Sequence, residues 1–109
     1  MSRLTTEIWV AAYRMRLDLA GITAFIVSKG DATAGAVLIK CATLDGQATA
    51  FQRTFDLQTG DRIWDTLIKG AEADVDQSIA KQRQFDPDLW VIEIEDRQGR
   101  HLLDEEGLN

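Results

Sequence analysis

The sequence predicts an α+β fold, in which a mainly antiparallel sheet of about five strands carries its helices on one face. Apolar residues recur every three or four positions over 4–20 and 71–85, which is the period of a helix. Short runs rich in β-branched and aromatic residues lie between and after these segments. Short turns join the runs, as between antiparallel neighbours. The expected order is α-β-β-β-β-α-β, with a possible short last strand.

The first helix, residues 4–20, has apolar residues around most of its circumference. Thr5 or Thr6 can cap its start, and Gly21 can end it by adopting a left-handed conformation. Because its polar stripe is narrow, we expect the helix to be covered both by its own sheet and by another subunit. One apolar stripe consists of Leu4, Ile8, Ala11, Met15 and Leu19, and a second of Trp9, Tyr13, Leu17 and Ala20.

The next segments predict three strands. Residues 22–28 and 35–42 are apolar on both faces, which is typical of central strands. Residues 29–35, with two glycines and an aspartate, are expected to join them as a turn or hairpin loop. A further turn at Asp45-Gly46 precedes the third strand, residues 48–56.

Residues 62–68 fit either a strand or a helical face, and we favour a strand because Gly70 leaves little length for a helix. The second helix, 71–85, has a thin apolar stripe and ends before Pro87. A strand is predicted over 89–95, and residues 101–105 can pair back as a short edge strand. All 109 residues form one domain, with a frayed tail over 105–109.

The composition excludes several classes of protein. The formal net charge of −6 disfavours nucleic-acid binding, and the basic residues are scattered. The chain has one cysteine and one histidine, too few for a structural zinc site, so we expect no metal and no cofactor. Neither a signal peptide nor a membrane span is visible, so we expect a cytoplasmic protein that does not bind membranes.

Few residues suggest chemistry, and each also has a structural interpretation. Cys41 is expected to be a half-buried apolar residue rather than a nucleophile, because nothing brings His101 to it. Arg53 shares an apolar strand face with Phe51 and Phe55. It is expected either to pair with a carboxylate such as Glu93 or Glu95, or to anchor an anionic ligand. The 30–35 loop is either a plain hairpin loop or an anion site built from backbone N–H groups.

Two motifs, GDATAG at 30–35 and FDPDLWVIE at 85–93, resemble those of an uncharacterised bacterial family. It is the domain-of-unknown-function family 1491, found mainly in alphaproteobacteria, and the resemblance covers nearly the whole chain. It implies a compact stand-alone domain, and it supplies no activity, cofactor or site residue.

The scarcity of reactive groups favours a binding protein over an enzyme. Our leading hypothesis is a non-enzymatic binding or interaction module that self-associates as a homodimer and can also have another protein partner. Its expected interface residues are Trp9, Tyr13, Leu17 and Trp90. The alternative is a protein, or even an enzyme, that binds a small molecule or anion. The residues of that alternative site are Gly30, Asp31, Thr33, Gly35, Arg53 and His101.

Overall fold

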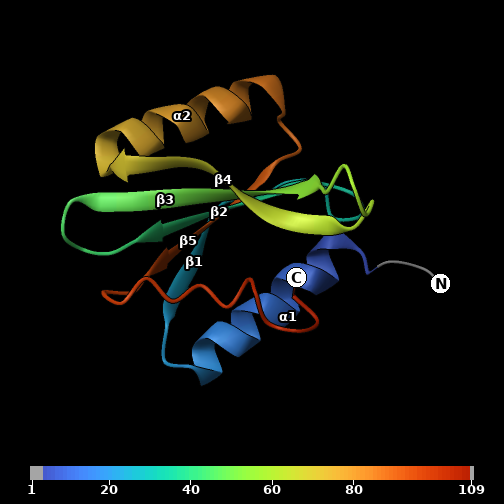
Figure 1. Ribbon diagram of the computed structural model, residues 1–109, viewed down its shortest axis with the longest axis horizontal. Helices are drawn as coiled ribbons and strands as arrows, with labels where there is room; N and C mark the ends of the chain where they lie inside the picture. Colours follow the sequence, from blue (N-terminus) through green and yellow to red (C-terminus); the bar gives the residue numbers. More distant parts are fainter. Residues whose placement is uncertain (1–3, 109) are drawn as a thin grey trace.

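A computed structural model describes residues 4–108 of the chain (Figure 1). These residues form two helices and five strands in the predicted order. They are α1 (Thr6–Leu19), β1 (Thr23–Ser28), β2 (Val37–Ala42), β3 (Gln47–Phe55), β4 (Arg62–Ala71), α2 (Glu72–Phe85) and β5 (Trp90–Glu95). The α+β class is therefore confirmed, and so is the strand that we favoured for residues 62–68.

The five strands form one open sheet in the order β1-β5-β2-β3-β4. β2 and β5 run parallel, and the other three neighbouring pairs are antiparallel. Because β5 lies between β1 and β2, the loop over 29–35 is a crossover and not the hairpin that we expected. β1 is an edge strand rather than a central one, and its residues Phe25 and Val27 are exposed.

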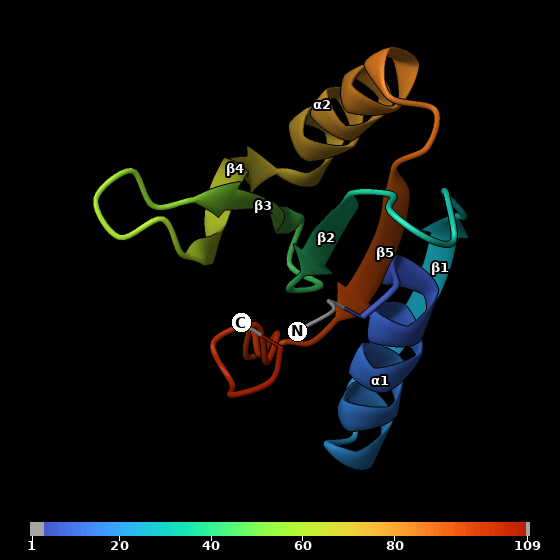
Figure 2. The ribbon, with the colours of Figure 1, turned by 90° about the vertical axis from the view of Figure 1, so that its right-hand side faces the viewer.

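The helices lie on opposite faces of the sheet, which corrects the prediction that both pack on one face (Figures 1 and 2). The reason is visible in β2, whose six residues are all buried. Ile39 and its alternate neighbours pack with residues of α1, whereas Leu38 packs with Val75 and Ile79 of α2. A strand that is apolar on both sides needs a cover on each.

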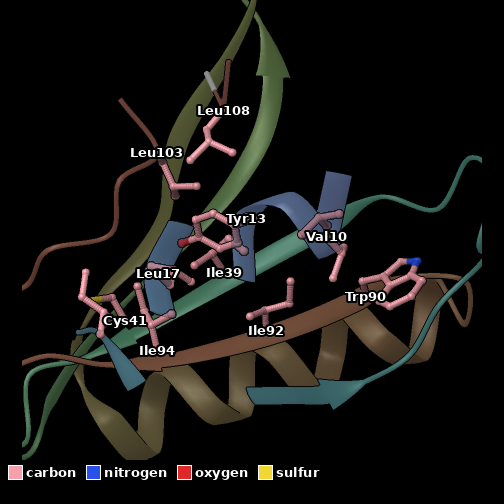
Figure 3. Packing of buried hydrophobic residues seen from close by; sticks show 12 residues of the cluster. Val10, Tyr13, Leu17, Ile39, Cys41, Trp90, Ile92, Ile94, Leu103 and Leu108 are labelled. Carbon is pink, nitrogen blue, oxygen red and sulfur yellow. The ribbon is translucent and has the colours of Figure 1, made fainter. Parts of the chain in front are cut away.

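α1 begins after Thr5, whose hydroxyl accepts a hydrogen bond from the Ile8 N–H, and Gly21 follows its end with φ of 74°. The stripe that contains Tyr13 and Leu17 faces the sheet (Figure 3). Tyr13, Leu17 and Trp90, which we expected at an interface, have at most 1 % of their surface exposed. They therefore belong to the core of the single chain, and the other stripe of α1 faces outwards.

The segment after β5 forms no strand, so the expected edge strand over 101–105 is wrong. It returns beside α1, and the Tyr13 hydroxyl donates to the carbonyl oxygen of His101 over 2.8 Å. The tail for which we expected fraying, 105–109, follows the buried Leu103 and contains the buried Leu108, and each of these two side chains is only 2 % exposed. Asn109 lies outside the described residues. Apolar burial thus continues to the end of the described chain.

Candidate ligand-binding site

The crossover loop 29–36 packs on the segment that leads into β5. The N–H of Asp31 donates to the carbonyl oxygen of Asp88 over 3.0 Å. A Cβ atom on Gly30 would lie 2.1 Å from that oxygen, and one on Gly35 would lie 2.6 Å from it. Only glycine fits at these two positions, because the backbone of the loop lies so close to the backbone at Asp88. This contact also explains why the two motifs of the sequence occur together.

Four backbone amides of this loop, those of Asp31, Thr33, Ala34 and Gly35, are already bonded within the chain. The carboxylate of Asp31 accepts from the N–H groups of Thr33 and Ala34, and the carbonyl of Asp31 accepts from Gly35. The carbonyls of Ala32 and Thr33 in turn accept from the first N–H groups of α1. These four amides are therefore not available to an anion, which was the alternative interpretation of the 30–35 loop. Gly30 and Asp31 shape the loop instead.

A cavity of about 700 Å³ opens where this loop, the start of α1 and the β3–β4 hairpin meet. Of the six residues predicted for a ligand site, Thr33, Gly35 and Arg53 line it, whereas Gly30, Asp31 and His101 do not. The described lining residues are Leu4, Thr5, Thr6, Trp9, residues 33–37, Arg53, Thr54, Phe55, Arg62, Trp64 and Gly107.

Arg53 lies between two tryptophan rings in the wall of the cavity. Its guanidinium carbon is 4.8 Å from the ring centre of Trp64 and 5.7 Å from that of Trp9. Its Nη2 also donates to the carbonyl oxygen of Leu108 over 2.6 Å. Pairing with Glu93, one of the expected structural roles, is not possible, because Glu93 lies on the α2 face of the sheet and bonds Lys40. Arg53 is thus fixed by aromatic rings and the C-terminal segment.

Three aromatic side chains form a continuous row beside the cavity. The Trp9 ring centre is 4.9 Å from that of Tyr13 and 5.5 Å from that of Trp64. The Trp64 indole N–H donates to the carbonyl of Leu108 over 3.0 Å. The Trp9 indole nitrogen is also buried, but it has no acceptor among the described residues. A buried donor without an acceptor is costly, so this wall has unused hydrogen-bonding capacity.

The charge of the lining is opposite to that of the protein. Arg53 and Arg62 line the cavity, and no described lining residue is acidic, although the whole chain has a net charge of −6. The N-terminus of α1 does not add to this charge as a direct donor, because its first N–H groups bond Ala32, Thr33 and Thr5. The arginine side chains therefore determine which ligands the cavity favours.

Arg62 and Trp64 were missed by the sequence interpretation. In the β3–β4 hairpin, Arg53 is opposite Trp64 and Phe55 is opposite Arg62. Residues opposite each other in an antiparallel pair point to the same side of the sheet. Counting outwards from the turn at 57–60 would have placed these four side chains together, once residues 62–68 were taken as a strand.

His101 and Cys41, the other candidates for chemistry, have structural positions. His101 Nδ1 accepts the N–H of Leu103 over 3.0 Å, and its ring lies 4.6 Å from that of Phe51. Cys41 is buried, and this burial, with a smaller effect of Asp96, raises the pKa of its thiol to about 11. Such a thiol is protonated at neutral pH and is a poor nucleophile.

The α2 face of the sheet contains a second charged group, centred on Lys40. Its Nζ lies 2.7 Å from carboxylate oxygens of Glu72 and Asp76 and 3.2 Å from one of Glu93. Burial alone lowers the pKa of Lys40, but hydrogen bonds to the three carboxylates outweigh it and raise the pKa above its ordinary value. The side chain is only 5 % exposed, so this cluster joins α2 to the sheet and offers little access to a ligand.

The described residues contain no group of three or more His, Cys, Asp or Glu side chains suited to holding a metal ion. Within the same part of the chain, no helix is long and apolar enough to cross a membrane.

These features define a small α+β protein with one open mixed sheet and a cationic, aromatic cavity at one end of it. The chain belongs to the DUF1491 family, described as a protein of unknown function, whose model matches residues 4–104. The family resemblance seen in the two motifs is therefore confirmed. No curated protein matches the chain.

Solved structures of other family members have the same fold. A crystal structure of a DUF1491 family protein from Caulobacter crescentus has 42 % sequence identity and a TM-score of 0.83, and the match covers 94 % of each chain. An NMR structure of a DUF1491 family protein from that organism gives the same identity and TM-score over 96 % of each chain. A solution structure of a protein from A. tumefaciens is 28 % identical, with a TM-score of 0.72 over 86 % of each chain.

Proposed function

We propose that this protein is a non-enzymatic binding protein that takes a small anion with a flat apolar body into the cavity beside Arg53. The observation that carries the proposal is the position of Arg53 and Arg62 next to Trp9 and Trp64 in one cavity wall. An aryl carboxylate is the simplest ligand that uses both kinds of side chain.

The size and the walls of the cavity support a small organic ligand. A volume of about 700 Å³ falls within the range typical of small-molecule sites, roughly 300–1,000 Å³. Trp9, Phe55 and Trp64 supply aromatic surface, and such surface favours offset or edge-to-face contact with another ring. The small residues Gly35 and Ala36 on the opposite loop leave room for a flat group.

The charge and the hydrogen-bonding groups support an anion. Guanidinium groups bind carboxylates and phosphates through directed N–H groups, and the pair of arginines attracts negative charge to a site on an otherwise acidic protein. The buried Trp9 N–H can donate to a carboxylate oxygen that reaches it. Thr5 is also a lining residue whose hydroxyl group can donate a hydrogen bond, whereas the hydroxyl of Thr6 already donates to the carbonyl oxygen of Gly35.

A matched pair of probes tests the role of charge. 2-Naphthoate and 2-naphthamide have nearly the same shape, but only the first is an anion. Titrations of ¹⁵N-labelled protein followed by NMR should show binding of the naphthoate at residues 33–37 and around Trp64. Binding of the amide should be at least about tenfold weaker, the size expected for losing one charge-assisted hydrogen bond. Equal affinity for both probes, or shifts confined to other regions, would contradict the proposal.

A matched pair of variants tests the position of the site. Arg62→Gln removes one of the two cavity charges and should weaken naphthoate binding by about tenfold. Arg97→Gln changes the net charge by the same amount at an exposed position outside the described lining. It should leave the affinity unchanged. A similar loss of affinity in both variants would indicate a general effect of net charge and not a site at Arg62.

We also infer a cytoplasmic location, which is supported by Cys41, a buried free thiol in a chain with a single cysteine. Fractionation of cells of the source organism, with an antibody against the protein, tests this. Recovery in the periplasmic or membrane fraction would contradict it.

A further inference from the structure

The outer face of α1 has exposed apolar side chains along its length. We define this face as Ile8, Ala11, Met15 and Leu19, which lie opposite the buried Tyr13 and Leu17. The exposed fractions are 54 % for Ile8, 66 % for Met15 and 82 % for Leu19. Spacings of three and four residues place these four positions in one stripe. An apolar stripe of this kind favours packing against another helix.

We propose that a second copy of this chain packs on the outer face, with the two α1 helices antiparallel around a two-fold axis near Ala11. In this arrangement Ile8 of each copy meets Met15 of the other. Ala11 of each copy lies near the axis, where its small side chain allows the two backbones to approach closely. The same face serves both copies, as a symmetric dimer requires.

The charges beside the outer face fit this partner and this orientation. Glu7 and Arg14 lie on the same flank of the stripe, seven residues apart, and both are exposed. Neither takes part in an ion pair among the residues that the structure describes. In an antiparallel dimer with two-fold symmetry, equal flanks meet, so Glu7 of each copy comes opposite Arg14 of the other. In a parallel pair the opposite flanks of the two helices would meet, so Glu7 and Arg14 would not face each other across the interface.

The extent of the face predicts a weak association. α1 has 14 residues and is therefore about 20 Å long at a rise of roughly 1.5 Å per residue. A contact limited to one helix of this length falls at the lower end of specific interfaces, so we expect a dissociation constant on the order of 10–100 μM. This proposal does not depend on the ligand site, because the outer face and the Arg53 cavity share no residue.

Sedimentation velocity over a range of protein concentrations tests the proposal. The wild-type mass should rise from the monomer value of 12.2 kDa towards twice that value as the concentration passes through about 10–100 μM. Met15→Glu should remove the dimer, whereas Leu57→Glu, the same kind of change at a fully exposed apolar residue in the β3–β4 loop, should leave it unchanged. Circular dichroism would show that each variant is folded.

A charge exchange tests the orientation. Glu7→Arg alone and Arg14→Glu alone should each weaken the dimer by about tenfold or more, because each places like charges opposite one another. The double variant restores opposite charges in both symmetric pairs and should recover the wild-type dissociation constant. A monomer at every concentration, a dimer that survives Met15→Glu, or a double variant as weak as the single ones would overturn the proposal.

Discussion

The indole N–H of Trp90 donates a hydrogen bond of 2.7 Å to the carbonyl oxygen of Asp31, which lies 59 residues earlier in the chain. Trp90 begins β5 and is only 1 % exposed, and the backbone of Asp31 is itself bonded to Asp88. The bond holds the crossover loop against the start of β5, an inner strand of the sheet. The same loop forms one wall of the Arg53 cavity, so the loop must be held in place before the cavity can form.

The first prediction concerns Gly30, which allows this close approach. Gly30→Ala would place a Cβ atom 2.1 Å from a backbone oxygen, so the loop or β5 must move. We expect it to lower the free energy of unfolding by about 2–3 kcal/mol in urea titrations. Gly60→Ala has open space but a φ of 75°, and it should cost only about 1 kcal/mol. An equal effect of both changes would show that the contact with Asp88 is relaxed in solution.

The second prediction concerns Leu108, whose side chain is 2 % exposed. Leu108→Ala should lower the free energy of unfolding by about 2–4 kcal/mol, as in other cores. Leu57→Ala removes the same atoms from a fully exposed side chain and should change it by less than about 0.5 kcal/mol. Thermal or urea unfolding of the two variants measures the difference. Similar stabilities would mean that the C-terminal segment is frayed after all.

The third prediction concerns Lys40 and its three carboxylates. Lys40→Met keeps most of the side-chain volume but leaves Glu93, whose side chain is only 17 % exposed, without its cation. We expect a loss of about 1–3 kcal/mol at pH 7, and Glu93→Gln added to this variant should recover part of it. Because folding raises the pKa of Lys40, its full contribution to the free energy of unfolding is present below the unfolded-state pKa of about 10.5. That contribution is lost as the pH rises above this value. A neutral Lys40→Met change would contradict this role.

The fourth prediction concerns Cys41, for which burial raises the pKa of the thiol to about 11 from an ordinary value of 9.0. As the pH rises, the thiol loses its proton in the unfolded chain before it does so in the folded chain. The free energy of unfolding therefore has its full value below pH 9 and falls as the pH rises to about 11. The free energy of unfolding should fall by roughly 3 kcal/mol on account of this residue. Urea unfolding at several pH values measures it, and Cys41→Ala should have a shallower pH dependence. Parallel curves for the two proteins would show that the thiol is not desolvated.

The type and order of the elements could be predicted from the sequence, because both depend on local patterns. The spacing of apolar residues, together with residues that cap or end helices, identified α1, α2 and β5. The position of Gly70 correctly disfavoured a helix over 62–68. The partners of the strands could not be predicted, because nothing local to β1 shows that β5 will separate it from β2. The predicted position of both helices on one face failed for a related reason. The two apolar sides of β2 were noted, but the sequence does not show which helix covers each side.

The candidate site was predicted only in part. Thr33, Gly35 and Arg53 converge as the alternative hypothesis required, but their neighbours depend on hairpin register and on the path of the C-terminal segment. Arg62 and Trp64 join the site through that register. His101 follows a segment with weak periodicity, and its ring packs on Phe51 away from the cavity lining. The two stripes of α1 were both identified, yet periodicity alone does not determine which one is buried.

The position of β5 in the sheet has a consequence for how the chain acquires its structure. β1 has its sheet hydrogen bonds with β5 alone, and β2 also needs β5 on one side. During synthesis, the chain before residue 90 can form the β2–β3–β4 meander and α1, but it cannot join β1 to that meander. The assembly of the sheet must therefore wait for the last fifth of the sequence, and such non-local pairing slows folding. Until β5 is inserted, the apolar edges of β1 and β2 are open to pairing with other chains, which makes this interval the one most exposed to aggregation.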